Sequence, residues 1–305
     1  MLKTESMHFY KTIFVLLIMF TNSKLFSYEE GIALNGDLEI YYRDYGPKDA
    51  EPILLVQGIG GQLINWPEHL IDFLLENNFR PIVYDNRDTG LSSRIPSDSF
   101  SDAKRDNTIV KNYIRYYLRL PIKSDYTLDD MAVDGISVLD KLDISEAHIL
   151  GISMGGMIAQ IIVSSNPERT KTFTLISSTA STPSPFNGPT RKVRKLLMNR
   201  TKNPNSTVDE RVARSRKIFT EIGYQGIDLN TEEFYNNVSI SIERGGKDDT
   251  GFGRQLNAIL ASQNRLDKVK SISSPTLIIH GLEDPLIKVK NAHKANKLIK
   301  GSKLI

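Results

Sequence analysis

The stretch Ala147–Gln160, AHILGISMGGMIAQ, decides the fold expected of this chain. An apolar run around Ile149-Leu150 predicts a buried strand, and the apolar residues that follow have the pattern of a helix. Ser153 lies between them, with Gly151 two residues before it and Gly155 two residues after it. This is the pattern of a nucleophile elbow, a sharp strand-to-helix turn that needs glycine wherever neighbouring backbone leaves no room for a Cβ atom.

An elbow would lift the Ser153 hydroxyl out of the sheet and place it near the positive end of the helix dipole. The alternative is an ordinary strand–helix turn in which Ser153 only caps the helix. The predicted strand before Ser153, the predicted helix after it and the additional glycine Gly156 favour the elbow.

Strands and helices alternate along most of the chain, which predicts a mostly parallel sheet wrapped by helices. Thr127 and Asp130 have the spacing of a capping box and should begin one of these helices. The expected elements in chain order are a hairpin of Ile32–Leu34 and Leu38–Arg43, strand Ile53–Gln57, helix Pro67–Glu76, strand Pro81–Tyr84, helix Thr127–Leu142, the strand and helix around Ser153, strand Thr172–Ile176, strand Thr276–Ile279 and helix Val289–Ile299.

Residues 183–274 differ in composition from the rest of the chain and are rich in proline, asparagine and charged residues. Helical stretches are expected there around Val193–Leu197, Val208–Ile218 and Phe252–Ala261. An insertion of this kind between two sheet strands predicts a helical cap over the active site. The expected organisation is therefore an α/β core in two parts, residues 28–182 and 275–305, with the cap at residues 183–274 and a separate segment at residues 1–27.

The composition excludes several classes of function. A chain of 305 residues with 40% hydrophobic residues can bury one large core, and a net charge of +3 gives no support for a nucleic-acid partner. The absence of cysteine excludes disulfides, a thiol nucleophile and thiolate metal ligands. No His, Asp or Glu cluster has metal-ligand spacing and no glycine-rich phosphate loop is present, so the sequence predicts neither a metal nor a cofactor. It does not predict the oligomeric state.

The first 27 residues predict export. Lys11 precedes the apolar stretch Ile13–Phe20, and eight residues are too short to span a bilayer but fit the core of a signal peptide. Cleavage after Ser27 would start the mature protein near Tyr28, in the periplasm or the medium, with no stable membrane span left. The alternative is a misplaced start codon, with Met7 or a later start giving a cytoplasmic protein.

Three stretches together resemble one known family: Val56–Gln62 with Trp66-Pro67, then Tyr84–Ser92, then Gly151–Gly156. From about Glu29 to its end the chain is similar to the α/β-hydrolases, in particular to the branch that contains the anthracycline methylesterases. The resemblance implies a doubly wound, mostly parallel sheet with a helical cap, and Ser153 as the nucleophile. It does not identify the substrate, because this fold hosts many chemistries.

The resemblance also implies a catalytic acid and an oxyanion hole. The acid matches Asp284, which follows a strand and a glycine turn; an ordinary solvated turn aspartate is the alternative, and the adjacent Glu283 would point the other way. The oxyanion hole matches the backbone N–H groups of Met154 and of Ile59, the residue after Gly58. The family's usual His-Gly before the second donor is Gln57-Gly58 here, which should adjust the loop without removing a backbone donor.

No histidine of this sequence lies where the family places its catalytic histidine, which predicts that the sequence is truncated. The family places this histidine roughly 25–30 residues beyond the acid, in the loop after the last strand, whereas 21 residues follow Asp284. Gly301–Ile305 has the character of the start of that strand, so the C-terminal strand and helix are expected to be incomplete and the histidine to lie beyond residue 305. His293 is the sole substitute, in a helix expected to pack outside the sheet. His280 is expected to be a core histidine, and Arg87, Asp88 and Gly90 to fix a loop beneath the site.

These features predict a serine hydrolase that cleaves a carboxylic ester of a small or medium apolar acid through an acyl-enzyme on Ser153. A serine at the elbow argues against haloalkane and epoxide chemistry, which needs a carboxylate nucleophile. Two alternatives stay open. The same site could cleave another acyl bond or transfer an acyl group, or the chain could be a non-catalytic, ligand-binding relative. Without a base, the chain as given should keep only residual activity.

Overall fold

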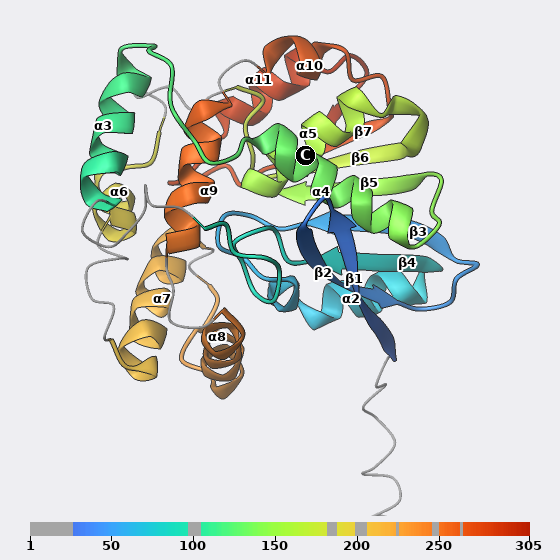
Figure 1. The fold of residues 1–305 in the computed structure, drawn as a ribbon, viewed down its shortest axis with the longest axis horizontal. Coiled ribbons are helices and arrows are strands. Elements are labelled where there is room, and N and C mark those ends of the chain that lie inside the picture. The colour runs from blue at the N-terminus through green and yellow to red at the C-terminus, as the bar shows by residue number, and fades with distance from the viewer. Residues whose placement is uncertain are drawn as a thin grey trace, which may run out of the picture.

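The computed structural model describes residues 27–96, 105–181, 188–198, 206–223, 226–245, 250–262 and 265–305. Its centre is a sheet with the strand order β1-β2-β4-β3-β5-β6-β7-β8 (Figure 1). The strands are β1 (Tyr28–Asn35), β2 (Leu38–Tyr45), β3 (Glu51–Val56), β4 (Phe79–Tyr84), β5 (Ala147–Ile152), β6 (Thr170–Ile176), β7 (Thr276–Ile279) and β8 (Lys303–Leu304). β2 pairs antiparallel with β1 and β4, and every other neighbouring pair is parallel. The predicted fold class is confirmed.

Side chains of the central strands alternate between two hydrophobic clusters, one on each face of the sheet. In β3, Leu54 and Val56 face the cluster formed with α4 (Leu128–Lys141), α5 (Met154–Ser165), α10 (Leu266–Lys270) and α11 (Lys290–Leu298). Ile53 and Leu55 face the other cluster, formed with α2 (Glu68–Glu76) and the 3₁₀ turn Leu63–Asn65. Because both faces are covered, the central strands are nearly continuous apolar runs.

Most of the elements expected from the sequence are present. The hairpin is present, but its turn consists of Gly36 and Asp37, one residue later than the predicted Asn35-Gly36, because Asn35 still pairs with Leu38. Gly36 has a φ of +59°, a conformation that favours glycine. The capping box of α4 is also present, because the Thr127 N–H donates to Asp130 Oδ2 at 2.7 Å and the Asp130 N–H donates to Thr127 Oγ1 at 3.4 Å. Lys303–Leu304 forms the edge strand expected near the end of the sequence.

Three helices of the described residues were not expected from the sequence: α3 (Arg105–Tyr117), α8 (Glu232–Gly245) and the short α10. None of the side chains of α8, whose sequence is EEFYNNVSISIERG, is fully buried. Helices of this kind depend on tertiary contacts that the sequence does not reveal.

Among the described residues, four helices follow β6 in the sequence before α10 and β7, namely α6 (Arg191–Met198), α7 (Val208–Ile222), α8 and α9 (Thr250–Ala261). Figure 1 shows them grouped to one side of the sheet, with α9 (orange) next to it. α3, from a different part of the chain, joins this group. It packs against α9, where Asn112 Nδ2 donates to Asn257 Oδ1 at 2.8 Å.

Candidate active site

Ser153 occupies the sharp turn between β5 and α5. Its φ of +55° and ψ of −120° are strained for a residue with a Cβ atom. The Ser153 N–H donates to Ile176 O at 3.0 Å, and Ser178 Oγ donates to Ser153 O at 2.6 Å, so the end of β6 holds this backbone in place. The Ser153 side chain makes no capping hydrogen bond to α5. The turn therefore has the geometry of a nucleophile elbow and not that of a simple serine cap.

The glycines around Ser153 are required by close backbone contacts. A Cβ atom on Gly155 would lie 2.0 Å from Val56 O, and one on Gly151 would lie 2.4 Å from Gly155 O. Both clashes are with backbone, which cannot move aside as a side chain can. The supporting role predicted for these two glycines has this physical basis.

The turn after β3 lies directly against Ser153. A Cβ atom on Gly58 would be 3.3 Å from Ser153 Cβ and 3.7 Å from Ser153 Oγ. The Gly61 N–H donates to Gly58 O at 3.1 Å, which closes a β-turn with Ile59 and Gly60 at its centre. Because Gly60 has a φ of +67° and Ile59 does not have a positive φ, the turn is of type II.

The structure brings the two predicted oxyanion donors to the same end of the sheet as Ser153. Ile59 is the second residue of the type II turn, whose closing hydrogen bond does not use the Ile59 N–H. Met154 is the first residue of α5, where backbone N–H groups have no acceptor within the helix. In place of the family's histidine, Gln57 accepts the Gly58 N–H on its Oε1 at 3.1 Å and so fixes the start of the turn.

Asp284 follows β7 at the same edge of the sheet, because β3, β5, β6 and β7 are parallel and end together. Its Oδ1 accepts the N–H groups of Leu286 and Ile287, both at 2.8 Å. The side chain is only 13% exposed, whereas Glu283 is exposed. Asp284 is thus a carboxylate oriented by backbone and not a freely solvated turn residue.

The described histidines do not supply a base for Ser153. His69 and His293 are exposed, with His293 on the outer side of α11. His148 lies at the start of β5, at the opposite edge of the sheet from Ser153, where it contacts Thr172. Within the described ranges, no hydrogen bond joins Ser153 to a histidine.

His280 is buried at the end of β7, as expected for a core histidine. Its Nε2 lies 2.5 Å from Ile287 O and 3.5 Å from Asp284 Oδ2, so it supports the turn that carries Asp284. β8 is the neighbour of β7 in the sheet, and the His280 N–H donates to Ile305 O at 3.2 Å.

Comparison with known proteins identifies the family. A family model described as alpha/beta hydrolase fold matches residues 51–305. The chain belongs to the α/β-hydrolase family.

The hydrolase is similar to the rhodomycin D methylesterase DnrP of Streptomyces peucetius, with 25% identity over 296 residues that cover 92% of this chain and 87% of that protein. It is also similar to a non-heme chloroperoxidase of Burkholderia pyrrocinia, at 23% identity, with coverage of 90% and 89%. The solved structure of the enol-lactonase from Burkholderia xenovorans shares its fold, with a TM-score of 0.65, 19% identity and 90% coverage of each chain. The predicted resemblance to anthracycline methylesterases is confirmed.

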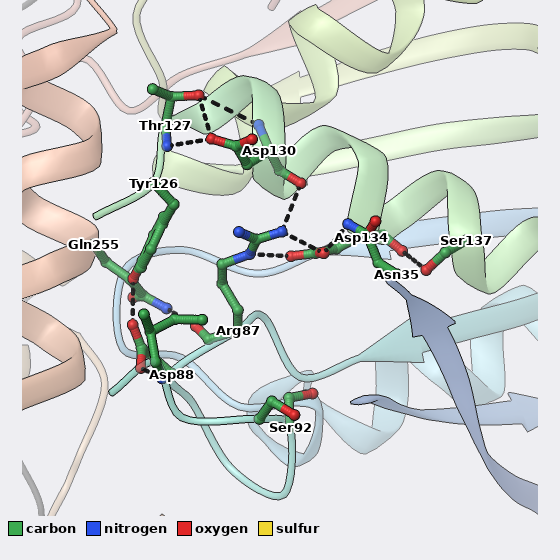
Figure 2. A network of polar contacts seen from close by, with 12 residues as sticks. Asn35, Arg87, Asp88, Ser92, Tyr126, Thr127, Asp130, Asp134, Ser137 and Gln255 are labelled. Carbon is green, nitrogen blue, oxygen red and sulfur yellow. Dashed lines mark hydrogen bonds and ion pairs between the residues drawn. The ribbon is translucent and has the colours of Figure 1, made fainter. Parts of the chain in front are cut away.

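A buried polar network supports the loop after β4 of this hydrolase (Figure 2). Arg87 donates from Nε and Nη2 to the two carboxylate oxygens of Asp134 on α4, at 2.6 and 2.7 Å. Tyr126 donates to Asp88 Oδ2 at 2.7 Å. Burial, together with this carboxylate, raises the pKa of Tyr126 far above its usual range, so Tyr126 stays a hydroxyl donor. The structural role expected of Arg87 and Asp88 agrees with these contacts.

Residues of α8 and α9 bind the core loops of the hydrolase, and the sequence did not reveal them. Arg254 forms a two-pronged ion pair with Asp88, at 2.9 and 2.7 Å. Arg244 donates to Asp85 Oδ2 at 2.7 Å, and Asp85 Oδ1 accepts the N–H of Leu63 at 2.7 Å. Burial raises the pKa of the Asp85 carboxyl, while these hydrogen bonds oppose the rise.

The described part of the hydrolase holds no cluster of three or more His, Asp or Glu side chains arranged to bind a metal ion. Across the same ranges, no helix has both the length and the apolar character needed to cross a bilayer.

Proposed function

We propose that this hydrolase cleaves a carboxylic ester of a small or medium apolar acid through an acyl-enzyme on Ser153. The strained backbone of Ser153, with a φ of +55° between β5 and α5, carries the proposal. Such strain is kept where it positions a reactive group, and here the neighbouring backbone enforces it. The methylesterase name of the relative DnrP supports an ester as the substrate.

In the proposed reaction, Ser153 Oγ attacks the ester carbonyl while a histidine base takes its proton. The oxygen of the tetrahedral intermediate receives hydrogen bonds from the N–H groups of Ile59 and Met154. The alcohol leaves with the proton from the base, and water then attacks the acyl-enzyme by the same route, releasing the acid and restoring Ser153. Asp284 orients the base and stabilises its charged form.

The base itself remains a prediction. None of the described histidines hydrogen-bonds to Ser153, and in this family the base comes from the loop that follows the last strand. We also propose that residues 183–274, which include α6, α7, α8 and α9, cap the site and set its substrate preference.

Active-site labelling of the full gene product tests the nucleophile. A fluorophosphonate probe should label Ser153, and Ser153→Ala should abolish both labelling and turnover of a p-nitrophenyl ester. Ser164→Ala is the matched control, because Ser164 lies at the far end of α5 and donates to Ile161 O. Labelling that survives in Ser153→Ala would reject the assignment.

The same assay separates the alternatives. A p-nitrophenolate burst followed by steady turnover indicates an acyl-enzyme. Turnover of an amide or thioester but not of the ester would identify another acyl bond as the target. A ligand-binding relative would hold the ester with neither burst nor turnover.

A further inference from the structure

We infer that Gln255 on α9 is a positioning residue that holds the oxyanion turn Gly58–Gly61 in place. The inference rests on the proposed function, because it concerns the N–H group of Ile59 in this turn. It begins from the contacts of one buried side-chain amide.

Gln255 is fully buried and its amide bridges two loops of the core. Its Oε1 accepts the Gly60 N–H at 2.8 Å. Its Nε2 donates to Arg87 O at 2.9 Å and to Thr89 Oγ1 at 2.8 Å. The amide thus ties the turn after β3 to the loop after β4.

The orientation of this amide follows from its partners. The Gly60 N–H requires an acceptor and Arg87 O requires a donor, so a flipped amide would lose both hydrogen bonds. The loop that contains Arg87 is itself held by the Arg87–Asp134 and Asp88–Arg254 ion pairs. Gln255 therefore connects the turn to a loop whose position is fixed.

The turn needs such support because glycine at its third position permits more than one geometry. In a type II turn, rotating the central peptide by about 180° gives the type I form, and Gly60 tolerates both. Accepting the Gly60 N–H fixes this central peptide, while Gln57 Oε1 fixes the Gly58 N–H at the start of the turn. These two hydrogen bonds hold the peptides on either side of the Gly58–Ile59 peptide, which carries the Ile59 N–H, and so keep this N–H in one direction.

This arrangement makes the oxyanion hole depend on α9. Loss of one oxyanion donor costs about 10²–10³ in kcat. We expect Gln255→Met, which has a similar shape but makes none of the three hydrogen bonds, to lower kcat by about 10–100-fold, part of that loss. KM should stay within about threefold, because the turn contributes more to the transition state than to the bound substrate.

Three measurements on the full gene product test the inference: kcat and KM for a p-nitrophenyl ester, inhibition by an alkyl trifluoromethyl ketone, and hydrogen exchange of the Gly60 amide. In Gln255→Met, inhibitor affinity should fall in parallel with kcat/KM, and Gly60 exchange should accelerate at least tenfold. Asn257→Ala is the matched control, because it removes a buried amide of the same helix that bonds to Asn112 of α3. It should lower Tm without changing kcat or Gly60 exchange.

Unchanged Gly60 exchange in Gln255→Met would overturn the contact, and faster exchange with normal kcat would overturn the positioning role. If Gln255→Met does not fold, Thr89→Val removes one of the three hydrogen bonds; it should raise Gly60 exchange and lower kcat together, and no change in either would overturn the inference. If the wild-type protein shows neither labelling of Ser153 nor turnover, the proposed function fails. The positioning role fails with it, while Gly60 exchange still reports on the contact.

Discussion

At the scale of single residues, close backbone contacts decide which side chains fit at the site. Ser153 is held in a strained conformation because the end of β6, through Ile176 and the following Ser178, bonds to its backbone. Gly155 lies where α5 meets the end of β3 and leaves no room for a Cβ atom. The glycines of the Gly151–Gly155 motif are required by steric contacts, so the motif could be recognised from the sequence alone.

Replacing Gly155 by alanine should disrupt the elbow. The new Cβ atom would lie 2.0 Å from Val56 O, so β3 and α5 must move apart. We expect a loss of stability in the range of severe core substitutions, about 3 kcal/mol or more, together with loss of turnover. Chemical denaturation measures the first and ester hydrolysis the second.

Gly281→Ala is the control for Gly155→Ala. A Cβ atom on Gly281 would have no neighbour within 4 Å, so its free energy of unfolding should change by less than about 0.5 kcal/mol. Equal effects of the two substitutions would contradict the steric explanation.

Replacing Asp284 by asparagine should separate the chemistry of this residue from its structural role. An asparagine Oδ1 can still accept the N–H groups of Leu286 and Ile287, so Tm should change little. Removing the charge should lower kcat by about 10⁴-fold, because the base loses the group that holds its tautomer and stabilises its cation. Near-normal turnover would exclude Asp284 as the acid. Glu283→Gln should have no effect, since Glu283 is exposed.

At the scale of elements, the sequence predicted what local patterns determine. The strand and helix around Ser153 are apolar runs, and α4 begins with a capping box. Both features were found where expected. α3 and α8 were missed because their stability depends on contacts with other helices. The contacts of α9 were missed for the same reason, since Arg254 and Gln255 lie 166 and 195 residues from Asp88 and Gly60.

The ion pair between Arg254 and Asp88 should anchor α9 to the core. Both side chains are at most 4% exposed, and Tyr126 donates to the same carboxylate. Arg254→Met would leave Asp88 buried without its cation, which typically costs about 3–5 kcal/mol. Chemical denaturation should show this loss.

An exposed ion pair provides the contrast. Asp267 is fully solvated beside Lys270, and Asp267→Asn should change the free energy of unfolding by less than about 1 kcal/mol. A change of the same small size in Arg254→Met would show that α9 is held by other contacts.

At the scale of the whole molecule, the sheet order assembles the site from distant parts of the chain. β3, β5 and β7 lie in one parallel block, so the Ile59 turn, Ser153 and Asp284 meet at its C-terminal edge. The resemblance of the sequence to the α/β-hydrolases predicted these three places. It did not reveal that α8 and α9 bind the same edge, because neither helix carries a motif that identifies its partner.

The predicted export signal, residues 1–27, precedes the first strand of the sheet. β1 begins at Tyr28 and pairs with β2 along its full length, and the Tyr28 ring packs against Tyr45 and lies under the guanidinium of Arg43. Removal of residues 1–27 would therefore leave the described contacts of the sheet intact. We expect intact mass spectrometry of protein from the periplasm or medium of the native host to show a chain that starts near Tyr28. A cytosolic product that retains Met1 would reject export, and the alternative of a misplaced start codon would be favoured by a cytosolic product that begins at Met7 or later.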